Sequence, residues 1–349
     1  FWINLTDDLF VIGENDLIFS SEESGTRRPI RVGRGGMTEQ LPSPKHINEI
    51  LSADSERIFV SGWDETPIEN QLYEINLKKL SISQLTHKNG WHTSSIDQKS
   101  NILIDCFSDQ NTPFESRLYS LDDMEQSDVI YKEEINSQHP YHVYSSSHAK
   151  VSFGEFNASD GQTLFYRLTP PRKICGKHPV INYVYGGPGA QKVKKEWGPL
   201  LLQLFAEEGF GVLEIDNRGS TNRGIGFESA IFRKLGQTEV EDQKEGLKVL
   251  QNIEWADQDR VGIFGHSYGG YMTLMCLSKA GTFFKSGAAV APVCDWRLYD
   301  SHYTERFMGN PGDNTKAYDE GNVLTHLPNL KSPLLLIHGM ADDNVLFTH

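Results

Sequence analysis

Apolar and polar residues alternate in two different ways along the chain. Residues 1 to about 140 show short apolar runs separated by polar turns, as in NDLIFSSEES (15–24), ERIFVSGWDE (56–65) and NILIDCFSDQ (101–110). Runs of this length, bounded by turn residues, predict β-strands. From about residue 150, apolar strands alternate with helical stretches, one of them a long helix near 238–253. That alternation predicts a parallel sheet covered by helices on both faces.

The strand-rich part contains a loose repeat. Phe19, Phe59 and Ile104 recur in the three segments at separations of 40 and 45 residues. The dipeptides Leu-Tyr and Gln-Leu recur at separations of 46 and 44 residues. A period of about 40–50 residues in all-β sequence favours four-stranded propeller blades, with a β-sandwich as the alternative. About three blades fit here, whereas closure takes roughly 4–8, so we expect a partial propeller whose first blades precede residue 1.

The pentapeptide GHSYG carries the candidate nucleophile, Ser267, because it matches the pattern G-x-S-x-G. It follows a predicted strand at 261–264 and precedes a helix that we expect to begin near Tyr271. A strand–turn–helix context is what a nucleophile elbow requires. The flanking glycines let neighbouring backbone pass closely, and the helix N-terminus favours developing negative charge. The pattern therefore predicts a serine whose hydroxyl projects from a tight turn.

A nucleophilic serine requires a histidine base that is oriented by a carboxylate. On this fold the chain order is Ser, Asp, His. Asp342 follows a predicted strand at 333–337 and is correctly placed for the carboxylate, while Asp343 is the rival and is otherwise an ordinary solvated loop acid. We interpret His266 and His338 as structural, because residues adjacent to the elbow serine point away from it and His338 precedes the acidic loop.

The amino-acid composition excludes some classes of binding partner and of bound metal. Asp and Glu number 47 against 33 Lys and Arg, and the net charge of −14 argues against nucleic acid or an anionic membrane as the main partner. No apolar run approaches the ~20 residues that span a bilayer. The four cysteines form no CxxC pair, so neither a disulfide framework nor a zinc site is implied, and Cys276 fits a small buried hydrophobe. The sequence does not fix the cellular compartment.

At these motifs the chain resembles the prolyl oligopeptidase family of serine peptidases, and within it the dipeptidyl peptidase IV branch. The matching segments are YVYGGPGAQ (183–191), DNRGSTNRG (216–224), LGQTEVEDQ (235–243), GHSYGGYMT (265–273), APVCDWRLYDSHYTERFMG (291–309) and HGMADDNV (338–345). The resemblance is strong over about residues 150–349 and rests only on the strand pattern before that. We therefore predict C-terminal blades of an incomplete β-propeller in residues 1–145. We predict an α/β-hydrolase domain, doubly wound around a mostly parallel sheet and C-terminally incomplete, in residues 146–349.

The resemblance implies roles for individual residues. Ser267 would be the acylated nucleophile and Asp342 the triad carboxylate. The hydroxyl of Tyr185 and the backbone N–H of Tyr268 would stabilise the oxyanion, where two donors act on charge as it develops. Asn344 would hydrogen-bond the carbonyl of the substrate's penultimate residue. The positions that match the branch's S1 pocket, which accepts proline, are Tyr299, Tyr303, Trp296, Val293 and Val345; each could otherwise be simply a core residue.

Two departures from the family pattern affect the expected activity. The branch reads the substrate's free N-terminus with a pair of glutamates in an earlier propeller segment, and no such segment can be assigned here. In the family the histidine follows the aspartate by a few tens of residues, whereas His349 comes only seven residues after Asp342. We therefore interpret His349 as a bystander and expect the catalytic histidine to lie outside this chain, which would leave the 349-residue chain inactive.

The resulting hypothesis is a serine peptidase that releases N-terminal dipeptides with Pro or Ala in second position, through an acyl-enzyme and without a metal or organic cofactor. Its partner would be a peptide with a free N-terminus, and relatives that dimerise through the hydrolase domain make a homodimer an open possibility. Two alternatives remain. One is another hydrolase of the same family, either an oligopeptidase, an acylaminoacyl peptidase or an esterase. The other is a non-catalytic protein that binds partners through its propeller.

Overall fold

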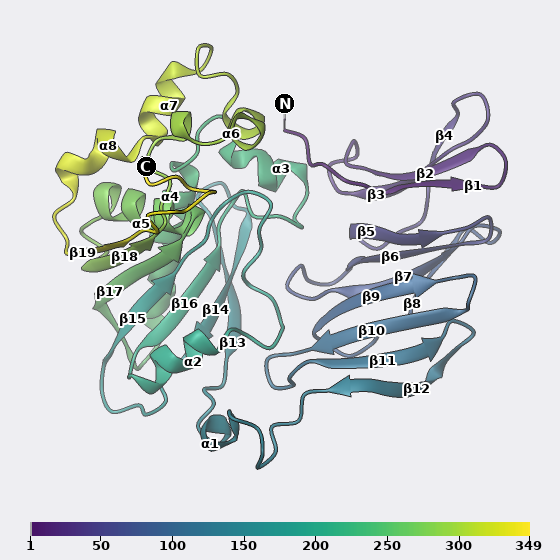
Figure 1. Ribbon diagram of the computed structural model, residues 1–349, viewed down its shortest axis with the longest axis horizontal. Helices are drawn as coiled ribbons and strands as arrows, with labels where there is room; N and C mark the ends of the chain where they lie inside the picture. Colours follow the sequence, from purple (N-terminus) through teal and green to yellow (C-terminus); the bar gives the residue numbers. More distant parts are fainter. Residues whose placement is uncertain (1) are drawn as a thin grey trace.

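The computed structural model describes residues 2–349, which form three small antiparallel sheets beside a larger α/β sheet (Figure 1). Each small sheet has four strands paired in chain order, β1 to β4, β5 to β8 and β9 to β12. Their bounds are β1 Leu9–Ile12, β2 Asp16–Ser21, β3 Arg28–Val32, β4 Thr38–Gln40, β5 His46–Ala53, β6 Arg57–Trp63, β7 Gln71–Asn76, β8 Ser81–Gln84, β9 Trp91–Asp97, β10 Ile102–Ser108, β11 Glu115–Ser120 and β12 Asp123–Lys132. Four-stranded meanders stacked in this way are propeller blades, as predicted, and not the two facing sheets of a sandwich.

Strand β6 shows why the blades stack, because apolar side chains leave both of its faces. Ile58 and Val60 pack into a cluster with Ile18 of the first blade. Phe59, between them, packs instead against Leu103 of the third blade. Successive side chains of a strand point to opposite faces, so a continuous apolar run in the middle blade binds a neighbour on each side.

The second unit is a seven-stranded sheet in the order β13-β14-β16-β15-β17-β18-β19. The five strands β16, β15, β17, β18 and β19 run parallel, and β13 and β14 add an antiparallel edge. Their bounds are β13 Ser152–Asn157, β14 Thr163–Thr169, β15 His178–Tyr183, β16 Gly211–Asp216, β17 Ala256–His266, β18 Ser286–Val290 and β19 Leu334–Ile337. This mostly parallel sheet confirms the predicted α/β-hydrolase class.

Helices cover the two faces of this sheet. Phe264 of β17 meets Phe205 of α2 edge to face at 5.9 Å, whereas its neighbour Ile263 points into the cluster around α5. The helices are α1 His142–Ser145, α2 Leu200–Glu207, α3 Ile225–Glu228, α4 Thr238–Gly246, α5 Tyr268–Lys279, α6 Ser301–Met308, α7 Thr315–Gly321 and α8 Val323–His326. Short 3₁₀ turns lie at η1 Ser229–Ile231, η2 Leu247–Asn252, η3 Trp296–Leu298 and η4 Leu327–Asn329. None of the helices within residues 2–349 has the length and hydrophobicity that a bilayer span requires.

Three sequence-based bounds need correction. The long helix expected near 238–253 is α4 followed by the 3₁₀ turn η2. The strand expected at 261–264 extends over Ala256–His266, because Ala256 pairs with His178 of β15 again beyond the polar DQDR segment, where the register shifts. The following helix begins at Tyr268, three residues before the expected start. The boundary predicted between residues 145 and 146 falls in the connection from β12 to β13, directly after α1.

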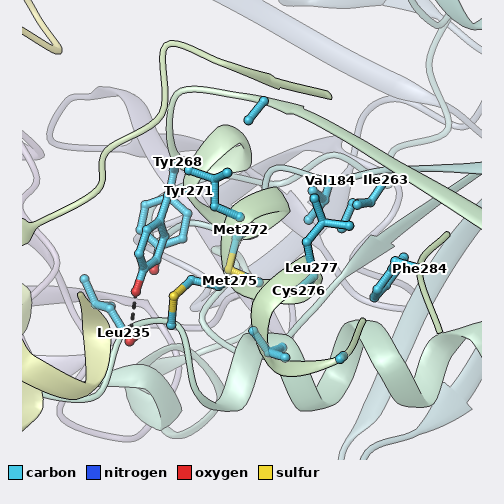
Figure 2. Close-up of a cluster of buried hydrophobic side chains, with 14 of the residues drawn as sticks. Val184, Leu235, Ile263, Tyr268, Tyr271, Met272, Met275, Cys276, Leu277 and Phe284 are labelled. Atoms are coloured by element: carbon cyan, nitrogen blue, oxygen red, sulfur yellow. Dashed lines mark hydrogen bonds between the residues drawn. The ribbon is translucent and has the colours of Figure 1, made fainter. Parts of the chain in front are cut away.

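Helix α5 is the centre of the main core. Its residues from Tyr268 to Ser278 are all buried, and Figure 2 shows them packed among Val184, Ile263 and Phe284. Cys276 is fully buried within this cluster, as expected for a small hydrophobe. A helix with no exposed face for three turns is held rigidly. The residue that precedes it is therefore fixed in position as well.

The two units contact each other directly. The indole N–H of Trp63 donates to the backbone carbonyl oxygen of Asn222 at 2.9 Å. The side-chain amide of Gln191 donates to the backbone carbonyl oxygen of Pro67 at 2.7 Å. Lys195 pairs with Glu69, with 2.5 Å between Nζ and Oε1. Trp63, Pro67 and Glu69 belong to the second blade, and their partners belong to the α/β unit. These contacts hold the blades and the α/β unit in a defined arrangement.

Candidate active site

Ser267 lies at the turn between β17 and α5 with φ +60° and ψ −120°. A non-glycine residue with positive φ is strained and persists only where its surroundings impose it. Here a Cβ on Gly265 would lie 2.2 Å from the carbonyl oxygen of Gly269, and one on Gly269 would lie 2.2 Å from that of Val184. The glycines of GHSYG are thus required by close backbone packing, which holds the serine in its strained conformation.

The Ser267 side chain is available for chemistry. Its backbone is anchored, because its N–H donates to Val290 at 2.9 Å and its carbonyl accepts from Tyr271 at 3.0 Å. The residue is half-buried. Among the hydrogen bonds of residues 2–349, none involves the Ser267 hydroxyl. The elbow therefore presents a fixed serine whose Oγ is not committed to a structural partner.

Tyr185 and Tyr268 lie beside each other next to the elbow. Tyr185 follows β15, and its ring centroid is 6.0 Å from that of Tyr268. Burial raises the pKa of the Tyr185 hydroxyl, so this group stays protonated at neutral pH and can donate a hydrogen bond. A Cβ on Gly187 would lie 2.7 Å from the Tyr268 ring. The GGP segment after Tyr185 therefore packs directly on the residue that follows the serine.

The aromatic residues predicted for a substrate pocket form one continuous cluster with the elbow. Trp296 stacks on Tyr303 with 6.0 Å between ring centroids, and Tyr299 meets Tyr303 edge to face at 5.5 Å. Trp296 also lies 5.3 Å from the ring of Tyr268. Trp296 is buried, whereas Tyr299 and Tyr303 remain partly exposed, so the cluster presents two tyrosine rings to solvent above a buried indole.

The remaining predicted pocket residues differ in their exposure. Val293 and Val345 are each 2% exposed and belong to the main core. Asn344 is exposed, and its side-chain oxygen accepts from the Tyr299 hydroxyl at 2.9 Å. The structure therefore brings Asn344 to the aromatic cluster and leaves its amide N–H free to donate. Val293 and Val345 are buried in the same core cluster as Trp296 and do not contribute to the exposed surface.

The acidic loop after β19 is ordered by Asp342. Its Oδ1 accepts from the backbone N–H of Asn344 at 3.1 Å and of Val345 at 3.0 Å. His338 bonds the Val345 carbonyl at 2.7 Å, and its Nε2 lies 3.8 Å from the other carboxylate oxygen. Asp343 is exposed. Of the two candidate acids, Asp342 is the one that the loop holds in a single orientation.

No complete triad is formed within residues 2–349. Nδ1 of His349 accepts from the backbone N–H of Cys294 at 3.2 Å, and its ring lies 6.3 Å from that of Tyr299. His266 is exposed. None of the histidines in the described part of the chain hydrogen-bonds to Ser267, and no group of three His, Cys, Asp or Glu side chains there is arranged to hold a metal ion.

Sequence reasoning missed one residue at this site. Glu239, in the first turn of α4, is completely buried, and its carboxylate accepts from the Tyr268 hydroxyl at 2.7 Å. Glu239 stands in the segment LGQTEVEDQ, which was quoted only for its resemblance. The sequence offered one signal, an acidic residue within a predicted helix. In the structure this helix also buries Val240, Asp242 and Gln243, and a buried acid requires a hydrogen-bond partner.

Comparison with known proteins agrees with this architecture. Residues 199–349 match the prolyl oligopeptidase family, and residues 1–114 match the dipeptidyl peptidase IV N-terminal region. Human dipeptidyl peptidase 8 is 34% identical over 91% of this chain and 36% of its own length. Dipeptidyl peptidase 4 of Trichophyton equinum is 36% identical over 85% of this chain and 40% of its own length.

A solved structure gives the same result. The crystal structure of Porphyromonas gingivalis dipeptidyl peptidase 4 superimposes with a TM-score of 0.89 at 27% identity, covering 98% of this chain and 49% of that one. The chain thus spans between about a third and a half of the length of these relatives.

Proposed function

The chain belongs to the prolyl oligopeptidase family, and from this membership we propose that the protein is a serine peptidase that releases dipeptides from the N-termini of peptides, with Pro or Ala in second position. The observation that carries the proposal is the joining of the Ser267 elbow to the aromatic cluster through Tyr268, whose ring lies 5.3 Å from that of Trp296. A reactive serine and a surface suited to a flat apolar ring are thus parts of one rigid structure.

The proposed reaction assigns one role to each of these groups. Ser267 Oγ attacks the scissile carbonyl, which places negative charge on the carbonyl oxygen. The Tyr185 hydroxyl and the Tyr268 backbone N–H donate to that oxygen, and preorganised donors of this kind are worth ~10²–10³ in rate each. Collapse of the intermediate breaks the C–N bond, the C-terminal part of the peptide leaves as an amine that takes up the proton removed from the Ser267 hydroxyl by the base, and the dipeptide remains as an ester on Ser267. Water then hydrolyses the ester.

Substrate choice rests on the aromatic cluster. The rings of Tyr299 and Tyr303 suit the compact ring of proline, and alanine fills the same space less well. In this proposal the amide N–H of Asn344 donates to the carbonyl of the substrate's penultimate residue, which is supported by the Tyr299 hydroxyl donating to the amide oxygen. This contact would fix the substrate backbone relative to Ser267.

The base that deprotonates Ser267 needs separate treatment. No histidine of residues 2–349 hydrogen-bonds to both Asp342 and Ser267, and a serine without its base reacts slowly. We propose that the 349-residue chain by itself is inactive. A fluorophosphonate should therefore label this chain weakly, and rapid stoichiometric labelling of Ser267 would contradict the proposal.

The peptidase activity is tested with protein produced from the complete reading frame. We expect hydrolysis of a Gly-Pro reporter with a free amine, no hydrolysis of the N-blocked reporter, and loss of activity in Ser267→Ala. Cleavage of the blocked reporter alone would instead identify an oligopeptidase or acylaminoacyl peptidase. Hydrolysis of simple esters without either peptide would identify an esterase, and no serine-dependent activity would favour a non-catalytic binding role.

A further inference from the structure

Glu239 is a buried acid for which the proposed reaction has no use. It is 0% exposed and lies in the first turn of α4. Its carboxylate accepts three hydrogen bonds, from the backbone N–H of Gly236 at 2.9 Å, from that of Gln237 at 3.1 Å and from the hydroxyl of Tyr268 at 2.7 Å. Burying a carboxyl group is costly unless it is bonded in this way, so the structure maintains this group against a substantial penalty.

The partner of Glu239 is the residue directly after the nucleophile. Burial, and secondarily the charge of Glu239, raise the pKa of the Tyr268 hydroxyl far above its ordinary value. The hydroxyl therefore remains protonated and donates to the carboxylate. Burial raises the pKa of Glu239, and the hydrogen bonds from the backbone and from Tyr268 act in the opposite direction by favouring the carboxylate. Within residues 2–349 Glu239 is the hydrogen-bond partner of the Tyr268 hydroxyl, which makes it the polar anchor of the Tyr268 side chain, and such a bond is stronger when the acceptor is charged.

The Tyr268 ring is in contact with the parts of the chain that carry both expected oxyanion donors. One is the backbone N–H of Tyr268 itself. The other is the hydroxyl of Tyr185, whose ring lies 6.0 Å from that of Tyr268 and whose following residues pack on it at Gly187. A shift of the Tyr268 ring would therefore displace two donors together, and donors about 1 Å out of place lose much of their effect.

We propose that Glu239 is a positioning residue for acyl transfer at Ser267: its carboxylate holds the Tyr268 hydroxyl and thereby aligns the two donors that stabilise the oxyanion. Glu239 does not touch the substrate. The inference rests on one part of the proposed function, namely that Ser267 is the nucleophile. It does not depend on which acyl group Ser267 accepts. It adds to the proposed roles a residue from a different helix, 28 positions before the serine.

The substitution Glu239→Gln tests the charge while keeping the size. A glutamine has one oxygen and one NH₂ group, so one of the three donors that now face the carboxylate would face another donor instead. Tyr268→Phe removes only the hydroxyl from the other side of the contact. Glu241→Gln, on the exposed face of the same helix, is the matched control. All variants are made in protein from the complete reading frame.

We measure the rate of Ser267 labelling by a fluorophosphonate, kcat and KM for the Gly-Pro reporter, and the thermal midpoint. Loss of a whole oxyanion donor lowers the rate by ~10²–10³, so misplacement should lower labelling and kcat by about tenfold, with KM nearly unchanged. Glu239→Gln and Tyr268→Phe should each show this loss. The double variant should be no slower than either one, because both act through one contact. Glu241→Gln should match the wild type.

Three results would overturn the inference: wild-type rates in Glu239→Gln, effects that multiply in the double variant, or a lowered thermal midpoint without loss of labelling rate. If Glu239→Gln does not fold, wild-type rates in Tyr268→Phe overturn it equally. Failure of the proposed function is distinguishable, because the wild type would then label at Ser267 but leave the Gly-Pro reporter intact, and the variants would still be compared by labelling. A wild type that does not label at all would refute both.

Discussion

His46 should make the protein sensitive to mild acid. It begins strand β5, is 2% exposed and stacks on Trp63 with 5.9 Å between ring centroids. Burial, and after it the positive charges of Arg27, Arg28 and Arg223, lower the pKa of His46 to about 3. Between about pH 3 and pH 6.5 the imidazole is therefore mostly neutral in the folded protein, whereas the unfolded chain is mostly protonated there.

The size of the effect follows from the two pKa values. An unfolded histidine titrates near 6.5, so the unfolded state binds the extra proton first as the pH falls. The contribution of His46 to stability is complete above about pH 6.5 and is lost progressively as the pH falls toward 3. Each pH unit in this window is worth ~1.4 kcal/mol. Between pH 7 and pH 5 the free energy of unfolding should fall by about 2 kcal/mol from this residue alone.

The assay is urea unfolding followed by tryptophan fluorescence at pH 7 and pH 5. His46→Phe keeps an aromatic ring against Trp63 but cannot titrate, so it should lose about 2 kcal/mol less than the wild type over this interval. His87→Gln removes an exposed histidine and should behave as the wild type does. Equal losses in wild type and His46→Phe would refute the reasoning, because other groups would then account for the whole acid response.

Three further substitutions test other parts of the structure. Gly269→Ala places a Cβ 2.2 Å from a backbone carbonyl oxygen, so we expect about 3 kcal/mol or more of destabilisation; a thermal midpoint equal to that of the wild type would be contrary evidence. Tyr299→Phe removes the hydrogen bond to Asn344, worth ~1 kcal/mol, and should raise KM for the Gly-Pro reporter about fivefold with kcat unchanged, whereas a fall in kcat alone would argue against a binding role. Glu214→Gln leaves the buried Arg167 unpaired and should destabilise by ~3–5 kcal/mol in urea unfolding; a change below 1 kcal/mol would show that the pair is solvated.

The sequence was sufficient for the fold class because the informative residues are local. Phe19, Phe59 and Ile104 fall in β2, β6 and β10, the second strand of each blade, and each of these strands contains three consecutive apolar residues. The tight turn at Ser267 can likewise be predicted from the sequence, since glycines at fixed spacing are needed wherever backbone segments approach this closely. Patterns of this kind depend only on neighbours within a few residues.

Contacts between distant segments could not be predicted. Trp2 packs into the core of the α/β unit against Phe307, and Arg306 donates to the carbonyl of Ile3 at 3.2 Å. An apolar residue near the start of a strand-rich segment gives no sign of a partner some 300 residues away. Glu239 was overlooked for the same reason, because its role depends on a hydroxyl that only the tertiary fold brings to it.

The segment from Gly186 to Trp197 has a consequence for protein engineering. It begins directly after Tyr185 at the elbow, and its later residues Gln191 and Lys195 are fixed to the blades at Pro67 and Glu69. A loop anchored at both ends cannot change length freely, so an insertion or deletion here should disturb both Tyr185, the proposed oxyanion donor, and the contact with the blades. Chimaeras between relatives should therefore exchange the segment from Gly186 to Trp197 together with the blade residues around Pro67 and Glu69 that it contacts.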